Sequence, residues 1–513
     1  MMLAKKLGCG LERGIELLFG LMVFYLWITS IFFNGITDES EANYINGDRW
    51  QLHLLILILF VCFCALCRNR GIRFPSGWTA GLFLVSACAG VLWILMVRTI
   101  PCVDQGDVVR IASKLMEHNS EEWLPYGYMD RNPDQRTIVF LYYLLFHVAG
   151  KGNYLFIQLL NVPFLLISIF FIGRMIKRVF PEGNRTAVMT GLACCIPFGM
   201  YITFVYGTIM GLMFAVAGID YVLCCMEDFR WKYCLLGSLG ILLAVWSKTN
   251  YLIFLIAVIC MLAADMIKSF QPKKLLLAAV VISVYLAGMM GLDAVLSSMI
   301  GMDIPKGVPK EGYVVMGLSD DSYRGPGWYN GYILSKYKEL GCDYETSKEY
   351  MRREMTELIK KRMEEPEDTL RFFFRKNVTQ WGSPAFQCFW IQTICESKIE
   401  QPPVVHSVLY GDGGLHRVLS DLFNVMQSLV YAGVCIFLVF HPKLGIGQLI
   451  FAIAFIGGFL FHMFWEAKGQ YTVVYYFCII PYAVMGYQSM AGWLDNAYRR
   501  YRGRAAGEME ERE

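Results

Sequence analysis

Long apolar runs, separated by polar connections that are often basic, dominate the chain. A helix needs about 20 mainly apolar residues to cross the roughly 30 Å hydrocarbon layer of a bilayer. The pattern therefore predicts an all-α polytopic membrane protein with about 12 transmembrane helices. The expected spans are residues 14–35, 50–67, 78–97, 153–173, 186–207, 209–225, 233–247, 250–267, 275–297, 418–440, 444–464 and 470–490.

One further apolar run, residues 137–150, is too short to cross and is expected to form an interfacial half-helix. With this run outside the bilayer core, the clusters of Lys and Arg all fall on one side, as the basic bias of cytoplasmic loops requires. The N- and C-termini are then both cytoplasmic. If the run crosses instead, or if residues 233–267 divide differently, the sidedness changes. The basic clusters are Arg68/Arg70/Arg73, Arg174/Lys177/Arg178/Arg185, Arg230/Lys232, Lys268/Lys273/Lys274 and Arg499/Arg500/Arg502/Arg504.

Composition agrees with this class and excludes others. Of 513 residues, 56% are hydrophobic and 17% charged, against about 25% charged in soluble domains, which excludes a soluble enzyme. The net charge of +3 gives no reason to expect nucleic-acid binding. The first span follows Lys5, Lys6 and Arg13 and lacks a small-residue cleavage site, so we interpret it as a retained anchor in the cell membrane.

The same sidedness leaves three polar regions on the extracytoplasmic face, where function is expected. They are the loop 98–136, the segment 298–417, and the turn around Glu466; a mixed-charge helix is predicted at 346–365. The chain then divides into N-terminal spans (1–97), a candidate catalytic outer loop with interfacial helices (98–152), a transmembrane core (153–297), an extracytoplasmic segment (298–417), C-terminal spans (418–490) and a cytoplasmic tail (491–513).

Two carboxylates open the first of these regions. Asp104 and Asp107 are three residues apart, which places both on one face of a helix. The pair fits a general base or a divalent-metal site at the membrane surface. A capped helix start explains the same spacing and is the more common reason for Asp at such a position.

Cationic and amide side chains follow in the same loop and beyond it. Arg131 and Arg136 lie beside Asn132 and Gln135, a mixture suited to a phosphate and a sugar, although each arginine alone fits interfacial snorkelling. Lys248 interrupts two apolar runs and fits either a topological anchor or a phosphate-binding cation.

Other ionisable and cysteine positions narrow the alternatives. Glu466 and Lys468 form a pair between two spans, for which a mutual ion pair is the plain explanation. Few ionisable residues lie within spans, which argues against a proton-coupled pump. Cys388 and Cys395 lie in the extracytoplasmic segment and are able to pair there, although the sequence does not fix that pairing.

Several segments together resemble the glycosyltransferase C superfamily, the membrane enzymes that include protein O-mannosyltransferases and lipid A aminoarabinose transferases. The resemblance is to uncharacterised members from Gram-positive bacteria and covers roughly residues 98–488. The chain differs in having two additional spans before the loop and RNPDQ where that group has a YPNN-type segment. The segments are VDQGDVVRIASKL, RNPDQRTIVFLYYLLFHVAGKGNY, FVYGTIMG, KTNYLIFLIA, GWYNGY, QWGSPAFQ and WEAKGQY.

This resemblance implies a polyprenyl-phosphate-linked sugar as donor and a cell-envelope glycan, lipid or protein as acceptor. It implies Asp104 as the base, with Asp107 beside it, and inversion at the anomeric carbon. The donor phosphate would be held by Lys248, Arg131 or Arg136, and sugar contacts would come from Asn132, Gln135 or Glu466. No cofactor is required, and a divalent metal on Asp104 and Asp107 is an option. We expect Asp104, Lys248 and Glu466 to border one cavity. The alternatives are a polysaccharide polymerase or ligase, a lipid-linked sugar transporter and a non-enzymatic scaffold.

Overall fold

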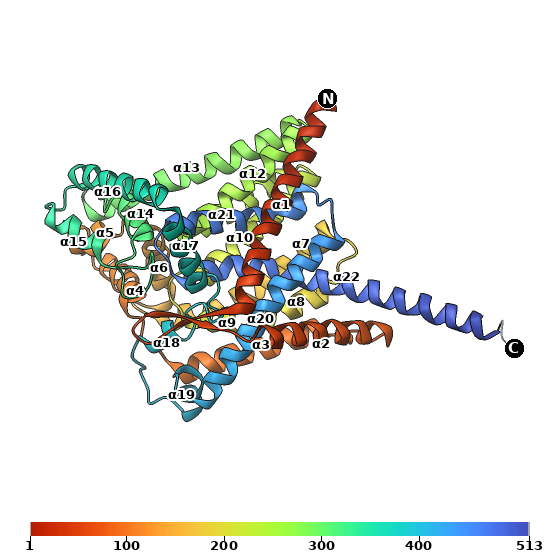
Figure 1. The fold of residues 1–513 in the computed structure, drawn as a ribbon. Coiled ribbons are helices and arrows are strands. Elements are labelled where there is room, and N and C mark those ends of the chain that lie inside the picture. The colour runs from red at the N-terminus through yellow and green to blue at the C-terminus, as the bar shows by residue number, and fades with distance from the viewer. Residues whose placement is uncertain (1, 511–513) are drawn as a thin grey trace.

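The protein is described by a computed structural model that covers residues 2–510, with side chains from 5 to 501. It is a bundle of apolar helices with polar elements gathered at one end (Figure 1). The bundle helices are α1 Met2–Phe32, α2 Trp50–Asn69, α3 Trp78–Val97, α7 Tyr154–Val179, α8 Arg185–Ala193, α9 Ile196–Gly199, α10 Thr208–Glu227, α11 Trp231–Ser247, α12 Leu252–Lys268, α13 Pro272–Ile300, α20 Gly414–Phe440, α21 Ile450–Phe464 and α22 Gly469–Glu510.

The elements at the polar end of the bundle come from three parts of the chain. The helices are α4 Val103–Met116, α5 Tyr128–Arg131, α6 Arg136–Ala149, α14 Glu311–Leu318, α15 Tyr332–Glu339, α16 Tyr344–Glu364, α17 Pro366–Gln380, α18 Trp390–Thr393 and α19 Pro403–Leu409. The strands are β1 Phe33–Thr37 and β2 Asn43–Gly47. Short 3-10 turns are η1 Glu121–Trp123, η2 Pro133–Gln135, η3 Met200–Thr203, η4 Thr249–Tyr251 and η5 Ile446–Leu449.

The helices confirm the all-α polytopic class. Within the described residues, nine helices are long and apolar enough to cross a membrane, and a bent pair raises the number to ten. The prediction of many apolar membrane-spanning helices is therefore confirmed, whereas the expected number of twelve is not. Three expected spans are not among the nine. Helix α11 has only 17 residues, and the run predicted as one span at 186–207 is broken between α8 and η3 by a bend of 63°. The third is the run 470–490, which forms the first half of α22.

The break has a local cause. Helix α8 ends at Ala193, and Pro197 lies in the first turn of α9. Proline lacks an N–H and clashes with the preceding turn of a helix, so it begins helices and does not continue them. The hydropathy of the run is continuous across this point and so does not reveal the bend.

Burial follows each helix's place in the bundle. In their most apolar 18 residues, α2 has 6% and α3 has 11% buried, whereas central α10 has 78%. Apolar side chains exposed along the whole length of such helices are typical of surfaces that face lipid. At the centre, α10 contacts α11 through Gly218 and Gly240, where a Cβ added to Gly240 would lie 2.7 Å from the Gly218 Cα. Small residues of this kind allow membrane helices to approach closely.

A hairpin that the sequence did not suggest contributes to the polar end. Strands β1 and β2 pair antiparallel, with Phe33 opposite Gly47. The Gly35 N–H donates to the Gly382 carbonyl, and the Asn43 N–H donates to that of Arg324. The hairpin is thereby joined to the 298–417 segment, whose α16 confirms the helix expected at 346–365.

Candidate functional site

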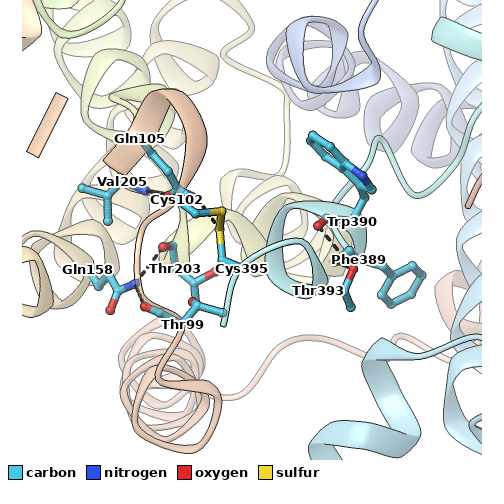
Figure 2. The surroundings of a disulfide bond; sticks show 10 residues. All are labelled: Thr99, Cys102, Gln105, Gln158, Thr203, Val205, Phe389, Trp390, Thr393 and Cys395. Atoms are coloured by element: carbon cyan, nitrogen blue, oxygen red, sulfur yellow. Dashed lines mark hydrogen bonds between the residues drawn. A yellow bond between two sulfur atoms is a disulfide. The ribbon is translucent and has the colours of Figure 1, made fainter. Parts of the chain in front are cut away.

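The start of α4 is anchored by a disulfide. Cys102 occupies the N-cap position of α4 and is bonded to Cys395, which lies 293 residues later (Figure 2). A backbone hydrogen bond joins the same two segments, because the Ile100 N–H donates to the Glu396 carbonyl at 2.8 Å. The pairing of Cys388 with Cys395, which the sequence left open, does not form, because Cys395 is bonded to Cys102 and Cys388 is a buried free thiol.

Side-chain amides tie this anchored loop to the chain before α10. The Gln105 Oε1 accepts from the Val205 N–H at 3.0 Å (Figure 2). The Gln158 Nε2, on α7, bridges the two segments by donating to the Thr99 carbonyl at 3.3 Å and the Thr203 carbonyl at 2.9 Å. Both amides are buried, where each hydrogen bond avoids the cost of an unpaired polar group. The segments carrying Asp104 and Tyr206 are therefore fixed relative to each other.

Asp104 lies in the first turn of α4 and does not cap it, since no side chain accepts from the free N–H groups of this helix. Its carboxylate accepts a hydrogen bond of 3.2 Å from the Tyr128 hydroxyl. Burial, together with the charge of Asp104, raises the pKa of Tyr128 well above its usual value, so this hydroxyl stays protonated and remains a donor. The arrangement orients the carboxylate and leaves it further acceptor positions.

Lys248 lies between α11 and η4 and is 8% exposed. Its ammonium donates to the Thr208 Oγ1 at 3.0 Å and makes no ion pair with any residue of the described chain. Three aromatic rings surround the Nζ atom, with centroids 5.7 Å away for Phe204, 5.2 Å for Tyr206 and 5.8 Å for Tyr471. Burial and the nearby Lys468 lower the pKa of Lys248 to about 7, and the charge of Asp104 partly opposes them. An anion arriving here would restore the charged form.

The position of Lys248 depends on Gly207, which has a φ of +73°. A Cβ at this residue would lie 1.9 Å from the carbonyl oxygen of Ser247. We expect Gly207→Ala to force the two segments apart and to lower thermal stability and any activity that depends on Lys248. Thermal unfolding of the purified protein measures the first effect. Gly301→Ala is the matched control, because Gly301 has a φ of +72° with no atom within 4 Å of the added Cβ; equal losses in both variants would contradict the steric explanation.

A buried charge cluster lies at the turn between α21 and α22. The Lys468 Nζ is 3.9 Å from a carboxylate oxygen of Glu466 and 3.9 Å from one of Glu41. The Arg324 Nε lies 2.8 Å from the other Glu41 oxygen. Glu466 is 3% exposed, and its buried Oε1 has no hydrogen-bond partner among the described residues.

The electrostatics of this cluster connect it to Asp104. Burial raises the pKa of Glu466 to about 7, with the charges of Glu41 and Asp104 adding to the effect and Lys468 opposing it. Burial lowers the pKa of Lys468, but the carboxylates of Glu466, Glu41 and Asp104 outweigh it and leave that pKa raised. Two groups, Lys248 and Glu466, therefore change charge near neutral pH in one electrostatic neighbourhood.

A narrow cavity of about 10 Å³ adjoins Lys248. It is just large enough for one water. Its lining includes Gln470 and Tyr471 but neither Asp104 nor Glu466, so it is not the shared cavity that we expected. A lipid-linked sugar would enter only if the surrounding side chains moved apart.

The other expected site residues lie between α4 and α6. The Arg131 guanidinium lies over the Tyr126 ring, with 5.2 Å to the centroid, and its buried Nε has no hydrogen-bond partner in the described chain. Arg136 instead forms a two-point ion pair with Asp293, at 2.6 and 3.2 Å. The Asn132 amide donates to the Tyr128 carbonyl at 3.4 Å. Gln135 ends η2, next to Asp134, whose carbonyl accepts from the Thr249 hydroxyl at 3.1 Å.

Asp107 differs from Asp104 in its partner. Arg110, which also pairs with Glu122, lies 2.6 Å from the Asp107 carboxylate and offsets part of its charge. Within residues 2–510, no group of three or more His, Cys, Asp or Glu side chains gathers as metal ligands would. Since Mg²⁺ and Mn²⁺ favour several oxygen ligands, the available donors do not fit a divalent cation held by the chain alone.

Sequence reasoning missed Glu41, Arg324, Tyr128 and Tyr206 as members of this neighbourhood. One signal was available for Glu41: the predicted sidedness also places the connection between the first two spans on the extracytoplasmic face. Tyr206 lies within the quoted FVYGTIMG segment. Arg324 offered no sequence signal, because its partner is far away in the chain.

Comparison with known proteins returned no matching family model, curated protein or solved structure.

Proposed function

We propose that the protein is a membrane glycosyltransferase that moves a sugar from a polyprenyl-phosphate donor to an acceptor hydroxyl, with Asp104 as the general base. The observation that carries the proposal is that a carboxylate and a buried cation of different character lie in one electrostatic neighbourhood. Asp104 is oriented by a single tyrosine hydroxyl, and Lys248 is a buried cation without a carboxylate partner among the described residues. The acceptor is a cell-envelope glycan, lipid or protein, and the sidedness argued from the basic clusters supports a site at the extracytoplasmic face of the membrane.

The reaction would be one direct displacement. Asp104 takes the proton of the acceptor hydroxyl as its oxygen attacks the anomeric carbon, and the bond from that carbon to the phosphate oxygen breaks. The electron pair of that bond remains on the phosphate, which leaves as polyprenyl phosphate. A single displacement inverts the configuration at the anomeric carbon. Stabilising the growing phosphate charge is then the main electrostatic task.

Lys248 is suited to that task, with Arg131 as a second cation. The Lys248 ammonium has donors to spare beyond Thr208, and an ammonium binds phosphate as a point charge. Arg136 would serve less directly, since Asp293 already neutralises it. The buried Glu466 would contact a sugar hydroxyl, as would Asn132 or Gln135.

Donor affinity is expected to fall as the pH rises through about 7. The pKa of Lys248 is lowered to about 7 and that of Glu466 is raised to about 7. Below that pH, Lys248 is positive and Glu466 neutral; above it, Lys248 is neutral and Glu466 negative, and both changes disfavour an anion. Titration of a polyprenyl-phosphate sugar into the purified protein, repeated between about pH 6 and about pH 8, measures how donor affinity changes with pH.

Two variants separate the contributions. Lys248→Met should weaken donor binding at low pH and flatten the profile, whereas Glu466→Gln should keep low-pH binding and lessen the fall at higher pH, leaving the part that is due to Lys248. Affinity that does not change with pH, or that rises with pH, would contradict the phosphate-binding role.

The disulfide supports the extracytoplasmic position of the site. Disulfides persist in oxidising compartments and are rare in the reducing cytosol, and Cys102 directly precedes the helix of Asp104. The function itself is tested by transfer of a radiolabelled sugar from polyprenyl phosphate in membranes, with Asp104→Asn as the comparison.

A further inference from the structure

A second charged region lies at the opposite end of the bundle. A cavity of about 290 Å³ is lined by Arg174, Lys177, Arg178, Arg185 and Glu227. Its residues come from the last turns of α7, the first residue of α8 and the last residue of α10. Helix α10 begins at Thr208, beside Lys248, and its 20 residues extend about 30 Å. This basic cavity is therefore about one membrane thickness, ~30 Å, away from Lys248.

Part of the positive charge in the basic cavity is already compensated. The Arg174 Nε donates to the buried Asp220 carboxylate at 2.5 Å. Arg178 pairs with Glu227 and lies 3.7 Å from the second Asp220 oxygen. These contacts hold α7 against α10 and account for two of the four cations.

The other two cations have no carboxylate partner in the described chain. Lys177 is exposed and makes no ion pair. The Arg185 guanidinium lies over the Phe170 ring, with 5.1 Å to the centroid, and its buried Nε has no hydrogen-bond partner. Four cations against two carboxylates leave an excess of two positive charges around an open volume, and such an excess attracts anions.

The chemistry of the lining indicates which anion fits. Guanidinium forks match the oxygens of a phosphate in a two-point geometry, and a lysine adds a point charge. Phe170 is 40% exposed on the apolar surface of the bundle, so Arg185 lies where that surface meets the basic cavity. Phosphates are abundant at this depth, and basic pockets between membrane helices bind anionic head groups there.

We propose that the basic cavity binds a phosphate group, carried either by an anionic phospholipid or by a small soluble phosphate compound. Lys177 and Arg185 bind the phosphate, while Arg174 and Arg178 remain paired with Asp220 and Glu227. The proposal is independent of the function assigned to Asp104, because the two regions share no residue.

The test uses the full-length protein, purified in a neutral detergent and freed of lipid. Phosphatidylglycerol binding is measured by native mass spectrometry, and inorganic phosphate binding by the shift in thermal unfolding. The variant Lys177→Gln/Arg185→Gln removes the two cations without a partner. The matched control, Lys232→Gln/Lys273→Gln, removes the same charge from exposed positions at the same end of the bundle.

We expect the first variant to bind phosphatidylglycerol about 25-fold more weakly than wild type, at about fivefold for each cation lost. The control should change affinity less than about twofold. If inorganic phosphate stabilises the wild type but not the double variant, and also displaces the lipid, the site is supported and its ligand is the small soluble phosphate compound. Equal loss in both variants, or no loss in either, would overturn the proposal.

If the double variant unfolds, Lys177→Gln alone, at an exposed position, should still weaken binding about fivefold. Unchanged affinity in that single variant would also overturn the proposal.

Discussion

Replacing Asp104 with asparagine is expected to lower the turnover of sugar transfer by about 10² to 10⁴-fold while leaving donor affinity nearly unchanged. Asparagine keeps the size of the side chain and accepts the Tyr128 hydrogen bond seen at 3.2 Å, but it cannot take a proton from the acceptor. The base acts on the proton in flight, so its loss affects the transition state and not the bound donor. Single-turnover kinetics together with donor titration measure the two quantities separately.

Asp107→Asn is the matched control for this substitution. Asp107 lies one helical turn away and pairs with Arg110 at 2.6 Å, an exposed contact worth about 0 to 1 kcal/mol. Turnover of the folded Asp107→Asn variant should therefore stay within a few-fold of wild type. An inactive but folded Asp107→Asn beside an active Asp104→Asn would move the base to Asp107 and contradict our assignment.

The second large effect is structural and concerns Lys376. Its fully buried ammonium donates to three backbone carbonyls, those of Gly317 at 2.6 Å, Trp465 at 2.7 Å and Met463 at 2.9 Å. These bonds join α14, α17 and the end of α21, directly before Glu466. Lys376→Met would leave three buried acceptors without a donor, and we expect it to lower the free energy of unfolding by about 3 to 5 kcal/mol. Thermal unfolding followed by tryptophan fluorescence detects a loss of this size.

Lys248→Met is the informative comparison, because burial lowers the pKa of both lysines to about 7. Lys248 has a single hydrogen-bond acceptor, the Thr208 hydroxyl, so its loss should cost only about 1 kcal/mol of stability and mainly weaken donor binding. Similar unfolding temperatures for the two variants would contradict the distinction between a structural and a ligand-binding lysine.

The sequence predicts the bundle well, because each span is specified by local hydropathy over about 20 residues. The helix of Asp104 is also specified locally, since 103–116 has an amphipathic pattern after a proline. Hydropathy specifies the number of spans less well, because apolar composition continues through the bend at Pro197. Hydropathy reports whether a segment is apolar enough to lie in the membrane, but it does not report whether the helix is straight.

The long-range parts of the candidate site could not be predicted from spacing. Cys395 lies near Cys388 in the chain, yet it pairs with Cys102 because the 395–398 segment runs antiparallel to residues 98–100. Glu41 meets Arg324 and Lys468 only after the hairpin, the 298–417 segment and the α21–α22 turn are folded together. Such pairings depend on tertiary packing, for which a single sequence carries no local signal.

The most direct test of the central claim is transfer by the purified protein in liposomes, supplied with a radiolabelled polyprenyl-phosphate sugar and a membrane extract as the acceptor source. We predict that wild type releases one polyprenyl phosphate for each sugar transferred, with inversion at the anomeric carbon, and that Asp104→Asn releases almost none while still binding the donor. Transfer at the wild-type rate by Asp104→Asn, or movement of the intact lipid-linked sugar between leaflets without release of polyprenyl phosphate, would contradict the account.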